Sequence, residues 1–301
     1  MTLRIGTRGS ALALAQARIV ADRLTARGHA CEIVTIHTEG DEAQADRSIV
    51  LTRGAFVTAL ERAVVEGRVD LAVHSAKDLP TGEREEVAIA AYPPRGDARD
   101  AIVTRDGAAL AGVPAGARVG TESPRRRAFL LRARPDLEIV PIRGNVDTRL
   151  RKLDAGEIDA LVLAACGLDR LGLARRIGEA LAVETMVPAV GQGALAVQSR
   201  SEDSGAAWAR ALDDRDTRHA VMAERRFLAA MGGGCRAPFA AHARIEAGRL
   251  ILDGAALSAD GRVAVRERLE GEPAEAEAMG EELAERLLSL GAAQLSAGSA
   301  A

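Results

Sequence analysis

Residues 3–27 read LRIGTRGSALALAQARIVADRLTAR, and the beginning of this stretch returns later in the chain. Leu3–Thr7 has the apolar content of a buried strand, and Ser10 stands where an N-cap residue precedes an alanine- and leucine-rich helix. Residues 118–121 (RVGT) repeat the RIGT of that strand, and Ser123-Pro124 again precedes a helical run. The sequence therefore predicts two units that begin with the same strand and capped helix.

Two further landmarks recur in the same order. Residues 32–34 (EIV) match residues 138–140 (EIV), and residues 67–70 (GRVD), which precede an apolar strand, match residues 156–159 (GEID). Matched landmarks in one order predict two similar α/β units, and parallel strands in such units bind ligands beyond their carboxyl ends. We expect the two units to face each other across a cleft.

The domain division follows from these landmarks. The predicted boundaries are 1–93 with 194–214 for the first α/β domain, 94–193 for the second, and 215–301 for a small C-terminal α+β domain. The joins at residues 91–96 and 188–193 are rich in turn formers, so two crossings of the chain would make a hinge. The C-terminal domain should hold a helix from about residue 217, three strands and a helix ended by Gly291, with a frayed tail at 294–301.

The composition excludes several classes of function. The chain has 301 residues, a formal net charge of -3 and 2% aromatic residues, so binding of nucleic acid by base stacking is disfavoured. It has no apolar run long enough for a membrane span and no signal peptide pattern at its beginning, so we expect a cytoplasmic protein without a membrane partner. Cys31, Cys166 and Cys235 lie far apart and indicate neither a disulfide framework nor a metal site.

An excess of arginine marks one segment as an anion site. Residues 118–151 carry nine arginines against four acidic residues. Ser123 as N-cap and Pro124 at the first helical position would aim backbone N–H groups and two guanidiniums at one spot. The guanidiniums expected at such spots are those of Arg125, Arg126, Arg143 and Arg149, with Arg8 near the Ser10 cap and Arg170 within reach of the cleft. A solvated basic face is the alternative.

Two other segments carry candidate chemistry. Residues 73–80 (VHSAKDLP) leave the end of a buried strand with Lys77 beside Asp78, which suits acid–base work, although a plain ion pair is the alternative. His74 is expected either in the core or behind the residues that contact ligand, because nothing nearby has the spacing of metal ligands. Residues 231–238 (MGGGCRAP) form a glycine loop that presents the thiol of Cys235, unless the cysteine is incidental.

Taken together, these segments resemble the porphobilinogen deaminase family along nearly the whole chain. The matching segments are residues 5–8 (IGTR), 74–80 (HSAKDLP), 119–121 with 125–126, 142–145 with 148–150, 188–193 and the Gly-Gly-Cys loop. The resemblance implies two periplasmic-binding-protein-like α/β domains and a small C-terminal domain. It also implies a transferase that joins four porphobilinogen molecules head to tail, releases ammonia and yields hydroxymethylbilane for tetrapyrrole and haem biosynthesis.

The resemblance further implies a dipyrromethane cofactor held by a thioether to Cys235, with Asp78 and Lys77 as catalytic residues. The implied cofactor-binding residues are Lys77, Asp78, Arg125, Arg126, Ser123, Arg149, Ser10, Thr121 and Gly193. The implied substrate-binding residues are Arg8, Ser10, Arg143, Arg149, Arg170, Gln192 and Phe56. A monomer that hands its product to uroporphyrinogen III synthase would fit this family.

The chain departs from the family at two places. Residues 51–54 (LTRG) replace a Gly-Gly-Lys-Gly or Gly-Gly-Thr-Gly turn, and Glu122 replaces a serine or glycine beside the anion site. A rival interpretation is a two-lobed binding protein for small anions without catalysis, which would have no use for Cys235. A second rival, a cysteine hydrolase or redox enzyme, needs a histidine base that the five histidines do not offer in any recognisable arrangement.

Overall fold

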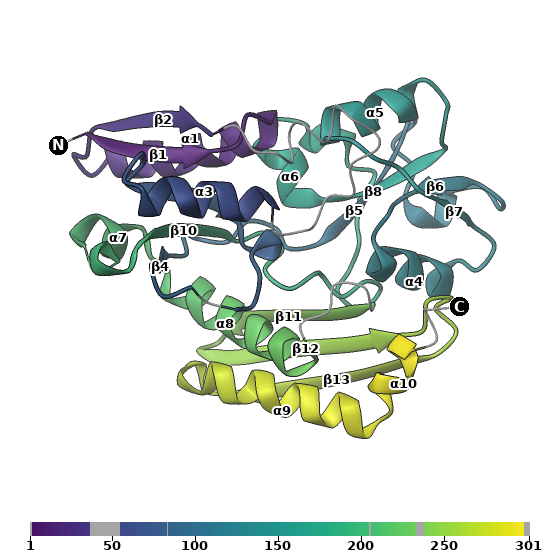
Figure 1. The fold of residues 1–301 in the computed structure, drawn as a ribbon. Coiled ribbons are helices and arrows are strands. Elements are labelled where there is room, and N and C mark those ends of the chain that lie inside the picture. The colour runs from purple at the N-terminus through teal and green to yellow at the C-terminus, as the bar shows by residue number, and fades with distance from the viewer. Residues whose placement is uncertain (1, 37–54, 83, 205, 233–237, 298–301) are drawn as a thin grey trace. The chain divides into compact units, whose positions relative to one another are not determined.

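A computed structural model describes residues 2–36, 55–82, 84–204, 206–232 and 238–297 (Figure 1). The chain divides into two compact units, Met1–Gly96 with Ala194–Arg218 and Asp97–Gly193 with His219–Ala301. It therefore passes from one unit to the other after Gly96, after Gly193 and within helix α8 (Arg215–Ala230). Within the described residues, no helix has the length and apolar character needed to cross a membrane.

The first unit is a five-stranded mixed sheet with helices on both faces. Its strand order is β2-β1-β3-β10-β4. The elements are β1 (Leu3–Thr7), α1 (Ala11–Thr25), β2 (Cys31–Thr35), α3 (Ala55–Val65), β3 (Leu71–Ser75), β4 (Val87–Ala91), β10 (Leu195–Arg200) and α7 (Ala207–Leu212). Leu71 and Val73 pack in the core under α1, whereas Ala72 packs in the core under α3, because successive strand residues point to opposite faces.

The second unit contains a sheet of the same design. Its strand order is β7-β6-β8-β5-β9. The elements are β5 (Asp100–Thr104), β6 (Arg118–Gly120), α4 (Pro124–Ala133), β7 (Glu138–Val140), α5 (Val146–Asp154), β8 (Ala160–Ala164), α6 (Ala165–Arg170) and β9 (Glu179–Ala180). Ile102 and Val162 pack in the core on the α4 side, whereas Ala101 and Leu161 pack with α5 and α6.

The predicted repeat is confirmed down to single hydrogen bonds. Ile5 lies opposite Leu71 in the first sheet, as Val119 lies opposite Ala160 in the second. In both sheets the aspartate that closes the turn before the second of these strands accepts a hydrogen bond from the arginine N–H of the first. The distances are 2.8 Å for Arg4 N to Asp70 Oδ2 and 2.8 Å for Arg118 N to Asp159 Oδ2.

Strand β10 runs antiparallel to β3, and strand β5 runs antiparallel to β8. The sequence patterns did not predict these antiparallel strands. The first residue of β10, Leu195, pairs with the last residue of β3, Ser75. In the same way Asp100, the first residue of β5, pairs with Ala164, the last residue of β8. An antiparallel strand therefore begins at the edge where its parallel neighbours end, and this brings Asp100 to the edge of the second sheet at which β8 ends.

The C-terminal segment is an antiparallel sheet covered by two helices. β11 (Phe239–Glu246), β12 (Arg249–Leu257) and β13 (Ala264–Gly271) pack against α8 and α9 (Ala276–Ser289). A Cβ added at Gly280 of α9 would lie 2.3 Å from the carbonyl oxygen of Ala223, so α8 and α9 meet backbone to backbone. The expected frayed tail at 294–301 is wrong at its beginning, because residues 294–297 belong to α10 (Ala292–Ala297) and Leu295 packs against the C-terminal core.

The C-terminal sheet shares a core with the second α/β sheet. Ala255 and Leu257 of β12 belong to the same buried cluster as Ala128 and Phe129 of α4. The turn at Gly261 lies so close to α4 that an added Cβ would be 2.2 Å from the Ala128 oxygen. This contact explains why residues 97–193 and 219–301 form one compact unit.

Candidate anion-binding and active site

Helix α4 begins as the sequence predicts. The Ser123 hydroxyl accepts a hydrogen bond from the Arg126 N–H at 3.3 Å, and Pro124 occupies the first helical turn. Thr121 Oγ1 accepts from the Ser123 N–H at 3.1 Å, which fixes the turn between β6 and the helix. These local bonds place Arg125 and Arg126 in the first turn, where the helix dipole favours anions.

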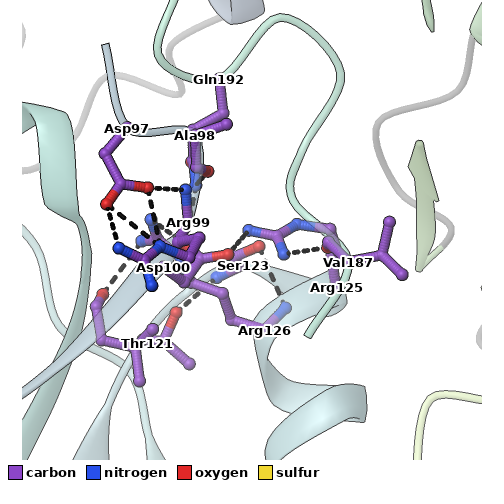
Figure 2. Close-up of polar contacts among 11 residues, drawn as sticks. Asp97, Ala98, Arg99, Asp100, Thr121, Ser123, Arg125, Arg126, Val187 and Gln192 are labelled. Carbon is purple, nitrogen blue, oxygen red and sulfur yellow. Dashed lines mark hydrogen bonds and ion pairs between the residues drawn. The ribbon is translucent and has the colours of Figure 1, made fainter. Parts of the chain in front are cut away.

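The two arginines converge on Asp100, as Figure 2 shows. Arg125 Nη2 lies 2.7 Å from Asp100 Oδ2, and Arg126 Nη2 and Nε each lie 2.8 Å from Asp100 Oδ1. Arg125 Nη1 also donates to the Val187 carbonyl at 2.7 Å, and Arg126 Nη1 to the Val162 carbonyl at 3.0 Å. The three charged residues are at most 8% exposed. The arginines are therefore held rigidly by a carboxylate and by backbone oxygens.

Asp100 remains ionised in this buried position. Burial by itself would raise the pKa of the carboxyl, but the guanidiniums of Arg125 and Arg126 outweigh it and lower the pKa to about 2. Burial lowers the pKa of Arg125, and Asp100 opposes that effect. Two guanidiniums against one carboxylate leave an excess of positive charge at the end of the sheet.

Asp100 is a site residue that the sequence patterns missed. The available signal was a carboxylate at the start of the apolar strand DAIVT, whose five residues are all buried. A charged residue is almost never fully buried unless it has a partner. That rule would have predicted a buried cation for Asp100, without identifying which arginine supplies it.

Gln192 joins the same cluster from the segment before β10. Its Nε2 donates to the Ala98 carbonyl at 2.8 Å and to Asp100 Oδ1 at 3.1 Å, and the residue is 1% exposed. These bonds connect residues 97–99, where the chain enters the second unit, to residues 191–193, where it leaves. The structure thus gives Gln192 a buried structural role beside the arginines.

Arg149 and Arg170 differ from the first two arginines because, within the described residues, neither forms a close ion pair, and Glu122 and Asp169 act on them only from a distance. Arg149 Nε donates to the Gly144 carbonyl at 2.7 Å, and Arg170 Nη2 to the Gly193 carbonyl at 2.5 Å. Burial lowers the pKa of both guanidiniums, and the neighbouring Arg126 lowers the pKa of Arg149 further. Neither has an ion-pair partner in the part of the chain that the structure describes.

The exposed Arg143 is paired with the acidic departure. Arg143 Nε lies 2.8 Å from Glu122 Oε1, and 81% of the Arg143 side chain is exposed. Asn145 is the N-cap residue of α5, although its side chain makes no capping hydrogen bond. Glu122 therefore competes directly for a guanidinium that the sequence assigned to substrate.

The first unit carries the predicted acid–base residues at the carboxyl ends of β1 and β3. These strands are parallel neighbours, so Arg8 and Ser10 after β1 share a sheet edge with Lys77 and Asp78 after β3. Ser10 caps α1 by accepting from the Ala13 N–H at 3.3 Å. Asp78 is exposed and Lys77 is half-buried.

His74 is a core residue of β3, as expected. Its side chain is buried, and burial lowers the pKa of the imidazole to about 4 although a hydrogen bond to Gln198 opposes the shift. Cys166 is also buried and Cys31 is half-buried, both as free thiols. No cluster of His, Cys, Asp or Glu suited to a metal ion occurs among the described residues.

Three predicted features lie beyond what the structure describes. Cys235 and residues 51–54 fall outside the described residues. Phe56 belongs to α3, but its side chain is not described. The roles assigned to them stay predictions.

Comparisons with known proteins agree with the resemblance. Residues 3–207 match the family model "Porphobilinogen deaminase, dipyromethane cofactor binding domain", and residues 219–289 match "Porphobilinogen deaminase, C-terminal domain". A porphobilinogen deaminase of Mycolicibacterium paratuberculosis is 48% identical over 306 residues, which cover 98% of this chain and 97% of that one. One of Pelobacter propionicus is 48% identical over 293 residues, covering 96% and 94%.

A solved periplasmic domain of Bordetella pertussis BvgS aligns with a TM-score of 0.39 at 16% identity, over 67% of this chain and 81% of that one. The strand order repeated in both α/β sheets and the added antiparallel sheet bear out the predicted fold class. With the two family models covering its α/β and C-terminal parts in order, the chain belongs to the porphobilinogen deaminase family.

Proposed function

We propose that the chain joins four porphobilinogen molecules head to tail, with release of one ammonia at each step, to give hydroxymethylbilane. The observation that carries this proposal is the match of nearly the whole chain to the family models and to relatives at 48% identity. The chain is thus a transferase of tetrapyrrole biosynthesis. The alternative of a small-anion binding protein without catalysis is not favoured, because these relatives are named as enzymes.

The cofactor of this family is a dipyrromethane, and the charges of the second unit suit its acidic side chains. Arg149 and Arg170 are half-buried guanidiniums without a carboxylate partner among the described residues. A bound carboxylate would offset the cost of their burial, which makes them the strongest candidates for holding cofactor and substrate. Arg125 and Arg126, already paired with Asp100, would contribute positive potential and remaining N–H groups.

The further residues proposed to bind the cofactor are Ser10, Lys77, Asp78, Thr121, Ser123 and Gly193. Those proposed to bind substrate are Arg8, Ser10, Phe56, Arg143, Arg149, Arg170 and Gln192. Cys235 would attach the cofactor through a thioether. The attached cofactor would then be the primer to which the first porphobilinogen is joined. We also propose three domains, which comprise residues 1–93 with 194–214, residues 94–193 and residues 215–301.

We assign the acid–base work to Asp78, with Lys77 beside it. Loss of ammonia leaves positive charge on the pyrrole of the substrate, and a carboxylate that accepts the pyrrole N–H stabilises that charge. Asp78 is exposed at the end of β3, so a ligand can reach it. Lys77 would pair with a substrate carboxylate and orient the ring.

Intact mass measurement and turnover together test this proposal. We expect the purified protein to carry an adduct of two pyrrole units and to lose it in Cys235→Ser. Asp78→Ala should keep the adduct but lose more than tenfold in turnover, which corresponds to about 1.4 kcal/mol of transition-state stabilisation. An unmodified thiol in active protein, or an Asp78→Ala variant within tenfold of the parent, would refute the assigned roles.

The setting of the enzyme is also proposed from the family and the composition. From the family we propose a cytoplasmic monomer that passes its product to uroporphyrinogen III synthase. Aromatic residues make up only 2% of the chain, which disfavours binding of nucleic acid by base stacking. Size-exclusion chromatography with light scattering tests the monomer directly.

A further inference from the structure

A buried glutamate on α8 binds two segments that are far apart in the sequence. Glu224 is 0% exposed. Its Oε2 accepts a hydrogen bond from the Gly191 N–H at 2.6 Å, and its Oε1 accepts one from the Ala243 N–H of β11 at 2.7 Å. His242 Nδ1 also lies 3.5 Å from Oε1. A carboxylate in such a position is costly to bury, and its two short hydrogen bonds to backbone N–H groups offset part of that cost.

These bonds connect the C-terminal sheet to the arginine cluster. Gly191 is the chain neighbour of Gln192, whose side chain holds the Ala98 carbonyl and Asp100. Asp100 in turn holds Arg125 and Arg126. A continuous path of short polar contacts thus runs from β11, through Glu224 and the 191–192 backbone, to the first turn of α4, all within the second unit.

We propose that Glu224 is a positioning residue for the bound pyrrole chain. By fixing the Gly191 backbone it sets the place of Gln192, and through Gln192 the place of Asp100 and the two arginines. The same carboxylate fixes β11, the strand that follows the cysteine loop in the chain. Glu224 itself contacts neither substrate nor cofactor. This inference rests on the proposed function, because the test measures binding of porphobilinogen.

Replacement by glutamine breaks this arrangement in a defined way. A carboxylate accepts at both oxygens, whereas an amide presents one oxygen and one NH2 group. In Glu224→Gln one of the two backbone N–H groups must therefore face another donor. We expect Gly191 to shift and the KM for porphobilinogen to rise about tenfold, which corresponds to about 1.4 kcal/mol of binding free energy, while kcat changes less.

A double-mutant cycle separates positioning from simple loss of stability. If Glu224 acts through Gln192, Glu224→Gln should raise KM about tenfold in the parent but at most about twofold in Gln192→Ala. Equal effects in both backgrounds would overturn the proposal. Turnover of porphobilinogen by the unaltered enzyme checks the function itself, so that failure of one is distinguishable from failure of the other.

Glu61→Gln is the matched control. Glu61 is also buried, at 5% exposure, but lies in the first unit and accepts from Gln198 Nε2 at 3.2 Å and Arg84 Nη1 at 3.1 Å. It should lower stability without raising KM, and an equal rise in KM would contradict a specific role for Glu224. If Glu224→Gln does not fold, Glu224→Asp keeps the charge but is one methylene shorter. It should then show the raised KM, and an unchanged KM would refute the proposal.

Discussion

Replacing Asp100 with asparagine should destabilise the second unit strongly. The substitution keeps the size of the side chain but leaves the buried guanidiniums of Arg125 and Arg126 without their counter-ion. Breaking a buried ion pair by removing one partner typically costs about 3 to 5 kcal/mol. That is a large part of the free energy of unfolding of an ordinary domain.

The pKa of Asp100 gives a second, independent value for this loss in the free energy of unfolding. The folded-state pKa of about 2 lies below the unfolded value of 3.8. A lowered carboxyl pKa contributes stability that is fully present above the unfolded value and is lost as the pH falls through the folded one. At about 1.4 kcal/mol per pKa unit, the contribution at neutral pH is about 2 to 3 kcal/mol, so the expected loss in the variant lies between about 2 and 5 kcal/mol.

Hydrogen exchange of the β5 and β8 amides measures this loss in the unit concerned, since core strands exchange through global opening. Asp97→Asn is the matched control, because it makes the same chemical change three residues away. Asp97 pairs with Arg99 at 2.7 Å, but the two side chains are 29% and 46% exposed, so its loss should cost less than about 1 kcal/mol. If Asp100→Asn costs no more than Asp97→Asn, or if its stability keeps the same acid dependence between pH 4 and 2, the reasoning is refuted.

Gly280→Ala should destabilise the protein by about 1 to 3 kcal/mol in urea unfolding, because its Cβ would lie 2.3 Å from the Ala223 oxygen. Helix propensity alone predicts a gain of about 1 kcal/mol, so a stabilised variant would disprove the close contact. Glu122→Gln should release Arg143 from an exposed pair and lower the KM for porphobilinogen by up to about fivefold, with little change in stability, and a raised KM would contradict this. The His74 imidazole, whose folded pKa is about 4 against 6.5 unfolded, should stay neutral between pH 8 and 5 by NMR, and stability should fall with pH below about 6.5. A titration midpoint near 6.5 would exclude its burial.

Local patterns in the sequence were sufficient for the elements that repeat in the two α/β sheets and for the family. The caps at Ser10 and Ser123 depend on hydrogen bonds to residues three positions ahead, so they can be predicted from the neighbouring letters. The repeat of RIGT and RVGT, with the aspartates at 70 and 159, likewise predicted two sheets of one design, and the structure confirms the matching register. Ordered motifs along the chain were specific enough for the porphobilinogen deaminase family.

The counter-charges of the site were decided by tertiary structure alone. Asp100 meets Arg125 and Arg126 only because β5 enters the sheet antiparallel, at the edge where β8 ends. The β5–β8 pairing joins residues that are far apart in the sequence. The periodicity of apolar residues in a strand does not tell whether the strand runs parallel or antiparallel to its neighbour. The number and positions of the arginines were therefore visible in the sequence. Which of them meet a carboxylate among the described residues was decided by the packing of the sheet.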